Sequence, residues 1–211
     1  MNIDIIYILT VVVVVLVSMT LHETMHAFAS YWLGDDTAKI NGRLTFNPIK
    51  HIDPFLTILL PITLAIVGAP IFGGAKPIPF NRDNLRWGDW GVAIVALSGP
   101  LTNLLISFIA FSVFVLLGLS AQGVLGQIFI TTVYVNLGLF IFNMIPVPPL
   151  DGSRLLYALA PDFFRNILES IEKFGLVIVF AILLLSGSAL ETFISKSISF
   201  FISAFGHVFG F

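Results

Sequence analysis

The feature that most constrains this chain is its first apolar segment. Residues 5–21 read IIYILTVVVVVLVSMTL and contain no charged side chain, and the first lysine of the sequence is Lys39. A secretory signal peptide would begin with basic residues and end at a small-residue cleavage site, and neither is visible here. We therefore expect a retained transmembrane helix that continues to about Leu33 and ends at Gly34.

The composition indicates that the rest of the chain is also in a membrane. Of the 211 residues, 57% are apolar and only 10% are charged, whereas about a quarter of the residues of a soluble domain are charged. The formal charge of −2 gives no reason to expect nucleic acid as a partner, and the absence of cysteine excludes disulfide and thiolate chemistry. We expect an all-α polytopic protein, embedded in the lipid bilayer as one domain over residues 1–211. Its core would cover about 5–160, followed by a C-terminal hydrophobic hairpin over about 168–209.

The later apolar segments differ in how they are interrupted. They cover 54–74, 91–119, 124–145, 174–188 and 192–205. Segment 54–74 contains three prolines and a glycine pair, and the polar segments on both sides of it carry Lys and Arg. The positive-inside rule places both polar segments in the cytoplasm. We therefore expect 54–74 to be re-entrant, leaving the membrane on the side where it entered.

A hairpin signal precedes the re-entrant segment. In the stretch AKINGRLTFNP, residues 38–48, β-branched residues lie on either side of Asn41-Gly42, a dipeptide typical of two-residue β-hairpin turns. The sequence predicts a small β-hairpin over 38–47. Its strands, or the segment 54–80, would offer edges to an extended peptide.

The first helix also carries a metal-binding pattern, His22-Glu23-Thr24-Met25-His26. Positions i and i+4 lie on one helix face, so both imidazoles can reach one ion, while the glutamate can take a proton from a metal-bound water. Ionisable residues within a transmembrane helix are costly and indicate function. The alternative is a pair of histidines that pack helices together, beside a glutamate that extends to the membrane surface.

Several residues are candidates for a third protein ligand. Catalytic zinc usually takes three protein ligands and a water. Segment 124–145 returns the chain to the level of the histidines, and the prolines after it prevent a continuous helix, which favours Asp151. As the N-cap of a helix over 152–160, Asp151 would have a structural role instead. The other candidates are His51, Asp53, Asp35 and His207.

Two of these segments together resemble a known family. The H-E-x-x-H of residues 22–26 and the later Asn143-Met-Ile-Pro146-Val-Pro148-Pro149-Leu-Asp151-Gly152 are similar to the paired motifs of the site-2 protease family of intramembrane zinc metalloproteases. The resemblance covers about residues 18–160 in the order of the family. Further similar stretches are Gly42-Arg-Leu-Thr-Phe-Asn47-Pro48, His51-Ile-Asp53-Pro54, Gly74-Ala-Lys76-Pro77-Ile-Pro79 and Ser98-Gly99-Pro100-Leu-Thr-Asn103.

This resemblance implies roles for individual residues. His22, His26 and Asp151 would bind Zn²⁺. Glu23 would act as the general base, and Asn143 would lie near the substrate carbonyl. The resemblance also implies a three-helix catalytic core with a hairpin and a re-entrant region between its first two helices. The core helices would be 5–33, 91–119 and 124–145, with additional helices at the C-terminus.

The expected function follows from these roles. The protein would hydrolyse a peptide bond in or near a transmembrane segment of a membrane protein, in regulated intramembrane proteolysis or in the clearance of signal-peptide remnants. It would be a minimal form without a PDZ or CBS domain, in a prokaryotic inner membrane, with the active site toward the cytoplasm. A zinc transporter, or a non-catalytic protein that binds membrane helices, is the alternative. The sequence predicts no particular oligomeric state.

Overall fold

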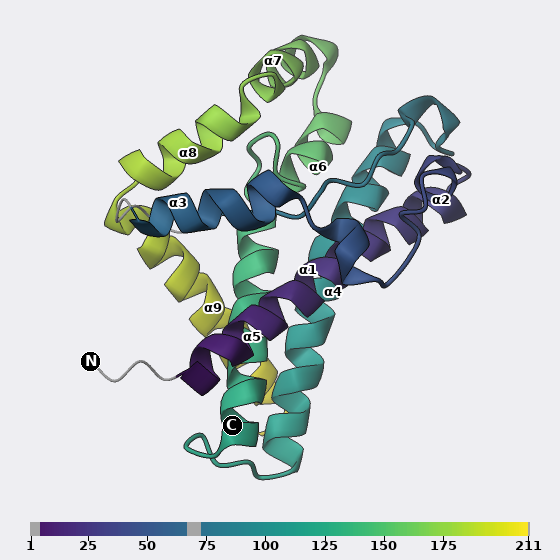
Figure 1. The fold of residues 1–211 in the computed structure, drawn as a ribbon. Helices are drawn as coiled ribbons and strands as arrows, with labels where there is room; N and C mark the ends of the chain where they lie inside the picture. Colours follow the sequence, from purple (N-terminus) through teal and green to yellow (C-terminus); the bar gives the residue numbers. More distant parts are fainter. Residues whose placement is uncertain (1–4, 67–72, 211) are drawn as a thin grey trace.

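The residues that the structure describes, 5–66 and 73–210, form helices joined by loops and contain no β-strand. Figure 1 shows this computed structural model. The long helices are α1 (Ile5–Trp32), α4 (Asp89–Leu116), α5 (Val124–Asn143) and α9 (Ser188–Val208). The shorter elements are α2 (Thr37–Ile40), η1 (Pro48–His51), η2 (Pro54–Leu59), α3 (Leu60–Ile66), η3 (Arg82–Asn84), α6 (Gly152–Leu159), α7 (Asp162–Glu172) and α8 (Gly175–Leu185).

Three apolar helices form the core of the fold. α4 and α5 lie side by side, and α1 crosses them diagonally (Figure 1). At 1.5 Å per residue, the 28 residues of α1 and of α4 each span about 42 Å, which exceeds the roughly 30 Å of a hydrocarbon core. α5 is shorter, and all three helices are long and apolar enough to cross a membrane. This confirms the prediction of an all-helical protein with several segments that can span a bilayer.

α1 changes character along its length. In its first half, side chains such as those of Leu9 and Val13 are more than half exposed, whereas in its second half Thr24 and Ala27 are fully buried. A polar group in a membrane costs least where protein rather than lipid surrounds it. The first half of α1 therefore presents an apolar surface to lipid, and the second half carries the polar pattern of residues 22–26 into the protein interior.

α4 approaches α1 closely because its buried face consists largely of small residues. Small side chains let two helix backbones come together in a membrane, where van der Waals contacts drive helix association. The small residues buried on α4 are Gly91, Ala93, Ala96, Gly99, Ser107 and Ala110. Among them, Gly99 lies directly against the two histidines of α1, whereas Ala110 packs in a cluster with α5 and α9.

The predicted β-hairpin over 38–47 is wrong, because Gly42 ends a helix. It follows α2 with a φ of +64°. The N–H groups of Gly42 and Arg43 donate to the carbonyl oxygens of Lys39 and Ala38, at 2.9 and 2.8 Å. These two hydrogen bonds make a Schellman motif. A glycine with positive φ serves a hairpin turn and a helix C-terminus equally well, so this residue alone does not distinguish them.

Segment 54–74 folds back toward its own start. η2 and α3 lead away from the core, and the chain returns at Gly74; residues 67–72 of this segment lie outside the described residues. The Gly74 N–H donates to the Leu56 carbonyl at 3.1 Å, and the Thr57 hydroxyl donates to the Gly74 carbonyl at 2.6 Å. The two ends of the segment therefore lie side by side, as they must in a re-entrant segment.

Ion pairs attach the helices that follow α5 to the core. Asp89, at the start of α4, pairs with Arg82 of η3 and with Arg165 of α7, the latter at 2.8 Å. Arg154 of α6 forms two hydrogen bonds with Glu172 at the end of α7. These contacts fix α6 and α7 relative to the start of α4.

α8 and α9 occupy the region expected to form a hydrophobic hairpin over about 168–209. The two helices are bent by 92° where they join. α9 then runs back along α5 (Figure 1) and packs on it through an apolar cluster. Aromatic members of this cluster are Phe108, Phe111, Phe129, Phe140, Phe201 and Phe205.

Candidate metal centre

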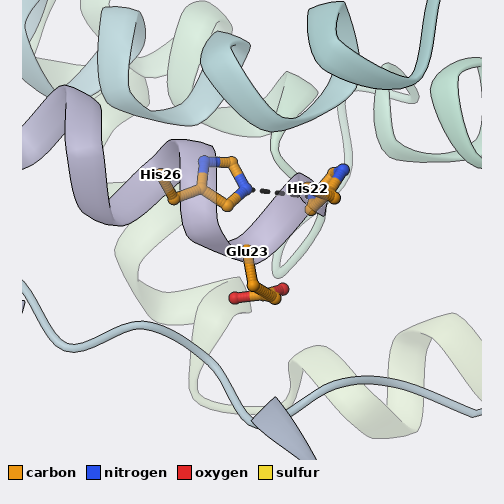
Figure 2. A group of neighbouring side chains, drawn as sticks. All are labelled: His22, Glu23 and His26. Carbon is orange, nitrogen blue, oxygen red and sulfur yellow. Dashed lines mark hydrogen bonds between the residues drawn. The ribbon is translucent and has the colours of Figure 1, made fainter. Parts of the chain in front are cut away.

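Two buried histidines of α1 face each other in the middle of the fold. The Nε2 atoms of His22 and His26 are 3.0 Å apart, and the rings are nearly perpendicular (Figure 2). Each residue is 7% exposed. They lie one helical turn apart, so the helix period places both rings on the face covered by α4. The prediction that this pattern brings two imidazoles together on one helix face agrees with their positions.

The second nitrogen of each ring has an acceptor as its partner. His26 Nδ1 lies 2.7 Å from the Val95 carbonyl oxygen, and His22 Nδ1 lies 2.6 Å from Asn103 Oδ1. Since both oxygens accept, each Nδ1 carries a proton, so Nε2 is the nitrogen through which each ring can bind a cation. In the metal-binding form of the two rings, both Nε2 lone pairs face each other and form no hydrogen bond. A cation between them satisfies both nitrogens.

Asp151 joins the two histidines from the other end of the sequence. Its Oδ2 lies 3.2 Å from His22 Nε2 and 3.5 Å from His26 Nε2. Asp151 immediately precedes α6, yet its side chain caps no N–H of that helix, so the N-cap alternative does not describe its contacts. The chain folds tightly here, because a Cβ at Gly152 would lie 2.4 Å from the Met144 carbonyl oxygen.

The three acceptor atoms fit a zinc ion. With Zn–N and Zn–O distances of about 2.0–2.2 Å, tetrahedral ligands lie roughly 3.3–3.6 Å apart. The measured separations are 3.0, 3.2 and 3.5 Å. Two imidazoles and one carboxylate are also a common donor set of catalytic zinc. Acceptor atoms this close repel one another unless a positive charge lies among them.

Glu23 and Asn143 border the same centre. The Glu23 carboxylate lies within 4.8 Å of the histidine nitrogens and points to one side of the ring pair (Figure 2). Asn143 ends α5 and donates from Nδ2 to the Leu139 carbonyl at 2.9 Å. A cleft of about 170 Å³ is lined by Met19, His22, Glu23, Gly73, Gly74, Ala75, Leu139, Phe142, Asn143 and Leu150. A larger groove of about 550 Å³ beside α9 offers one carboxylate, that of Glu191, and no histidine.

The other candidate ligands have different surroundings. His51 is buried and lies with Nε2 2.8 Å from the Thr45 carbonyl oxygen. Asp53 accepts hydrogen bonds from two backbone N–H groups at the start of η2. His207 is exposed near the end of α9. These side chains have structural or surface positions.

Asp35 is fully buried, and its carboxylate connects two loops through hydrogen bonds. It accepts hydrogen bonds from the Thr37 hydroxyl at 2.6 Å, the Asn81 N–H at 2.8 Å and the Asn84 side chain at 3.1 Å. Burial raises the pKa of Asp35, but these hydrogen bonds outweigh it and bring the pKa below its usual value. The anion therefore ties the loop after α1 to the loop before α4.

Two residues of α4 to which no individual role is assigned from the sequence also touch the histidines. A Cβ at Gly99 would lie 2.4 Å from His26 Nε2 and 2.7 Å from His22 Nε2. Only a residue without a side chain allows α4 to come so close. Asn103 supplies the acceptor for His22 Nδ1. The signal of both residues in the sequence is the stretch Ser98-Gly99-Pro100-Leu-Thr-Asn103, which resembles the protease family.

Comparison with known proteins points to one family. Residues 118–186 match the sequence profile of Peptidase family M50. Over 176 residues the chain is 41% identical to the candidate zinc metalloprotease YwhC of Bacillus subtilis (strain 168), and the match covers 79% of this chain and 76% of YwhC. It is 29% identical over 176 residues to Rip2 of Mycolicibacterium smegmatis, also named a candidate zinc metalloprotease, and spans 64% of that protein's length. No solved structure matches significantly.

The match to YwhC covers most of both chains, and its sequence identity is high enough to indicate a shared fold. It agrees with the apolar helices and with the convergence of two imidazoles and a carboxylate. The chain therefore belongs to Peptidase family M50, the site-2 protease family of intramembrane zinc metalloproteases.

Proposed function

We propose that this metalloprotease holds Zn²⁺ with His22, His26 and Asp151 and hydrolyses a peptide bond in or near a transmembrane segment of another membrane protein. The observation that carries this proposal is the convergence of three acceptor atoms from α1 and from the turn before α6. The zinc metalloprotease names of the relatives support the choice of ion. The whole chain would act as a single membrane-embedded domain.

The residues around the cleft have distinct tasks in this reaction. Bound zinc would polarise the substrate carbonyl and lower the pKa of the attacking water. Glu23, half-buried beside the histidines, takes the proton from that water and returns it to the leaving amine. Asn143 lines the same cleft, and the amide hydrogen that is not bound to Leu139 would donate to the substrate oxygen.

We further propose that the extended segment 73–77 positions the substrate. The backbone N–H groups of Gly74 and Lys76 both donate to the re-entrant side of the fold, at 3.1 and 2.8 Å. In an extended chain the residue between them points its N–H and C=O the opposite way. That residue, Ala75, lines the cleft, and its backbone has no hydrogen-bond partner within the described residues. An unwound substrate strand would pair with it.

Replacing Ala75 with proline tests this pairing. Proline removes the N–H, which binds no group within the described chain, and prolines already occupy positions 77 and 79 of the same segment. We expect cleavage of a membrane-protein reporter in liposomes to fall roughly ten- to hundredfold, the effect of losing a hydrogen bond in the transition state. Zinc content should not change. Ala75→Gly, which keeps the N–H, is the control, and a proline variant as active as this control would exclude the pairing.

We also propose a prokaryotic inner membrane as the location, with the cleft toward the cytoplasm. The segments on either side of 54–74 carry Lys39, Lys50, Lys76 and Arg86. The positive-inside rule places both segments on the cytoplasmic side. The return of Gly74 to Leu56 is consistent with this arrangement, because the segment between them would enter and leave on one side.

The zinc content of purified wild-type protein and of Asp151→Ala tests the proposed function. We expect about one zinc per wild-type chain and a marked loss in the variant, since two histidines would remain of three protein ligands. Asp53→Ala is the matched control, because it removes a carboxylate that caps η2 and lies outside the cluster. Zinc retained in Asp151→Ala, or absent from the wild type, would contradict the proposed centre.

A further inference from the structure

A chain of hydrogen bonds connects His22 to the backbone of α5. Asn103 of α4 and Asn136 of α5 are both fully buried. Asn103 Oδ1 lies 2.6 Å from His22 Nδ1, and Asn103 Nδ2 donates to Asn136 Oδ1 at 2.8 Å. Asn136 Nδ2 then donates to the Thr132 carbonyl at 2.8 Å and to the Ser18 hydroxyl at 2.9 Å. Three helices thus meet through two side-chain amides.

The direction of this chain is fixed at its far end. A backbone carbonyl such as that of Thr132 only accepts, so the amide group of Asn136 that contacts it must be NH₂. The oxygen of Asn136 then faces Asn103, so Asn103 must donate to it from its own NH₂ group. Asn103 therefore turns its oxygen to His22, whose Nδ1 must donate. Each step leaves one choice, and the last step places a proton on Nδ1 of His22, which leaves Nε2 as the nitrogen that can bind a metal.

The two histidines reach the same protonation pattern by different routes. His26 Nδ1 contacts the Val95 carbonyl directly. His22 has no such carbonyl partner and depends on the two amides. In a membrane helix most carbonyls are taken by the helix itself, so a side-chain amide is the acceptor available at this position. Asn136 donates both of its amide hydrogens and accepts one hydrogen bond with its oxygen.

We propose that Asn103 and Asn136 are positioning residues that hold His22 in the form that binds metal. This inference rests on the proposed role of His22 as a zinc ligand. Its distinctive consequence concerns Asn136, which touches neither the ion nor any of its ligands and yet sets the affinity for zinc. If these hydrogen bonds only joined helices, replacing Asn136 would lower the stability of the fold. It would not change the zinc affinity or the position of the ring proton on His22.

The test compares zinc affinity, measured by competition with a chelator, in three variants. Asn136→Leu breaks the chain without touching His22, and we expect binding to weaken roughly tenfold or more, as for other groups that orient metal ligands. Asn136→Asp should restore affinity near that of the wild type, because its neutral acid accepts from Asn103 and donates to Thr132. Ser107→Ala, which removes a different fully buried polar group, a hydroxyl of α4, should bind like the wild type. Equal affinity in Asn136→Leu and Ser107→Ala would overturn the proposal.

A second measurement covers the case in which Asn136→Leu does not fold. In zinc-free wild-type protein labelled with ¹⁵N-histidine, magnetic resonance identifies which ring nitrogen carries the proton. We expect Nδ1 of His22 to be protonated, and a proton on Nε2 instead would overturn the proposal. Failure of the proposed function and failure of the positioning role can be told apart. A wild-type protein that binds no zinc refutes the proposed function, whereas the ring proton of His22 still decides the role of the two asparagines.

Discussion

Replacing Glu23 with glutamine should abolish peptide hydrolysis and leave the zinc content unchanged. Glutamine has nearly the same shape but cannot take a proton from water, and general-base catalysis contributes about 10²–10⁴-fold to the rate. The three acceptor atoms of His22, His26 and Asp151 are not altered by this change. The measurements are cleavage of a membrane-protein reporter in liposomes and zinc per chain. Glu169→Gln, on α7 away from the cleft, is the matched control.

The same variant separates the protease from the other functions that the sequence leaves open. A zinc transporter has no need of a base beside its ligands, so the Glu23 variant would still move zinc. A non-catalytic helix-binding protein would keep its cellular function. Wild-type cleavage rates in Glu23→Gln would remove this residue from the mechanism, because no other role assigned to it depends on its charge.

Replacing Gly99 with alanine should eliminate zinc binding while the helices remain folded. The added Cβ would lie 2.4 Å from His26 Nε2 and 2.7 Å from His22 Nε2, much closer than non-bonded atoms approach. Either α4 moves away from α1 or the rings turn, and in both cases the ligand atoms no longer converge. We expect the zinc content to fall close to zero, and cleavage to fall with it.

A matched glycine on the neighbouring helix provides the control for Gly99. A Cβ at Gly138 of α5 would have no atom within 4 Å, so Gly138→Ala should bind zinc and cleave like the wild type. Circular dichroism would show that both variants keep their helices. A Gly99→Ala protein with a full complement of zinc would mean that α4 does not lie as close to the histidines as its backbone indicates.

The sequence predicts the parts of the centre that depend on local periodicity. A spacing of four residues places His22 and His26 on one face in any helix, so the fold does not have to be known. Asp151 requires more, because its depth follows from counting helices and their directions. Asn103 and Gly99 act across helices whose contacts depend on packing, and no local pattern reports that their neighbours are histidines more than seventy positions earlier.

The error over 38–47 has a similar cause. The β-branched residues around Gly42 favour a strand, and the positive φ suits a hairpin turn. The structure instead uses this φ to end α2, and α2 itself begins beside Asp35, which receives hydrogen bonds from Thr37 and from the distant loop at Asn81. A contact between segments more than forty residues apart thus decides between a helix end and a hairpin turn at Gly42. The local sequence alone is compatible with both.

The separation of the proposed metal ligands along the chain also has a consequence for the synthesis of the protein. His22 and Asp151 stand 129 positions apart (151 − 22), with α4 and α5 between them. During synthesis α1 enters the membrane first, and its two histidines have no carboxylate partner until α5 has been inserted and the turn after it has folded. If these three residues bind the zinc as proposed, the protease would remain inactive during synthesis. The centre would form only in a chain that has assembled all three core helices, so truncated or misinserted products would carry no hydrolytic activity.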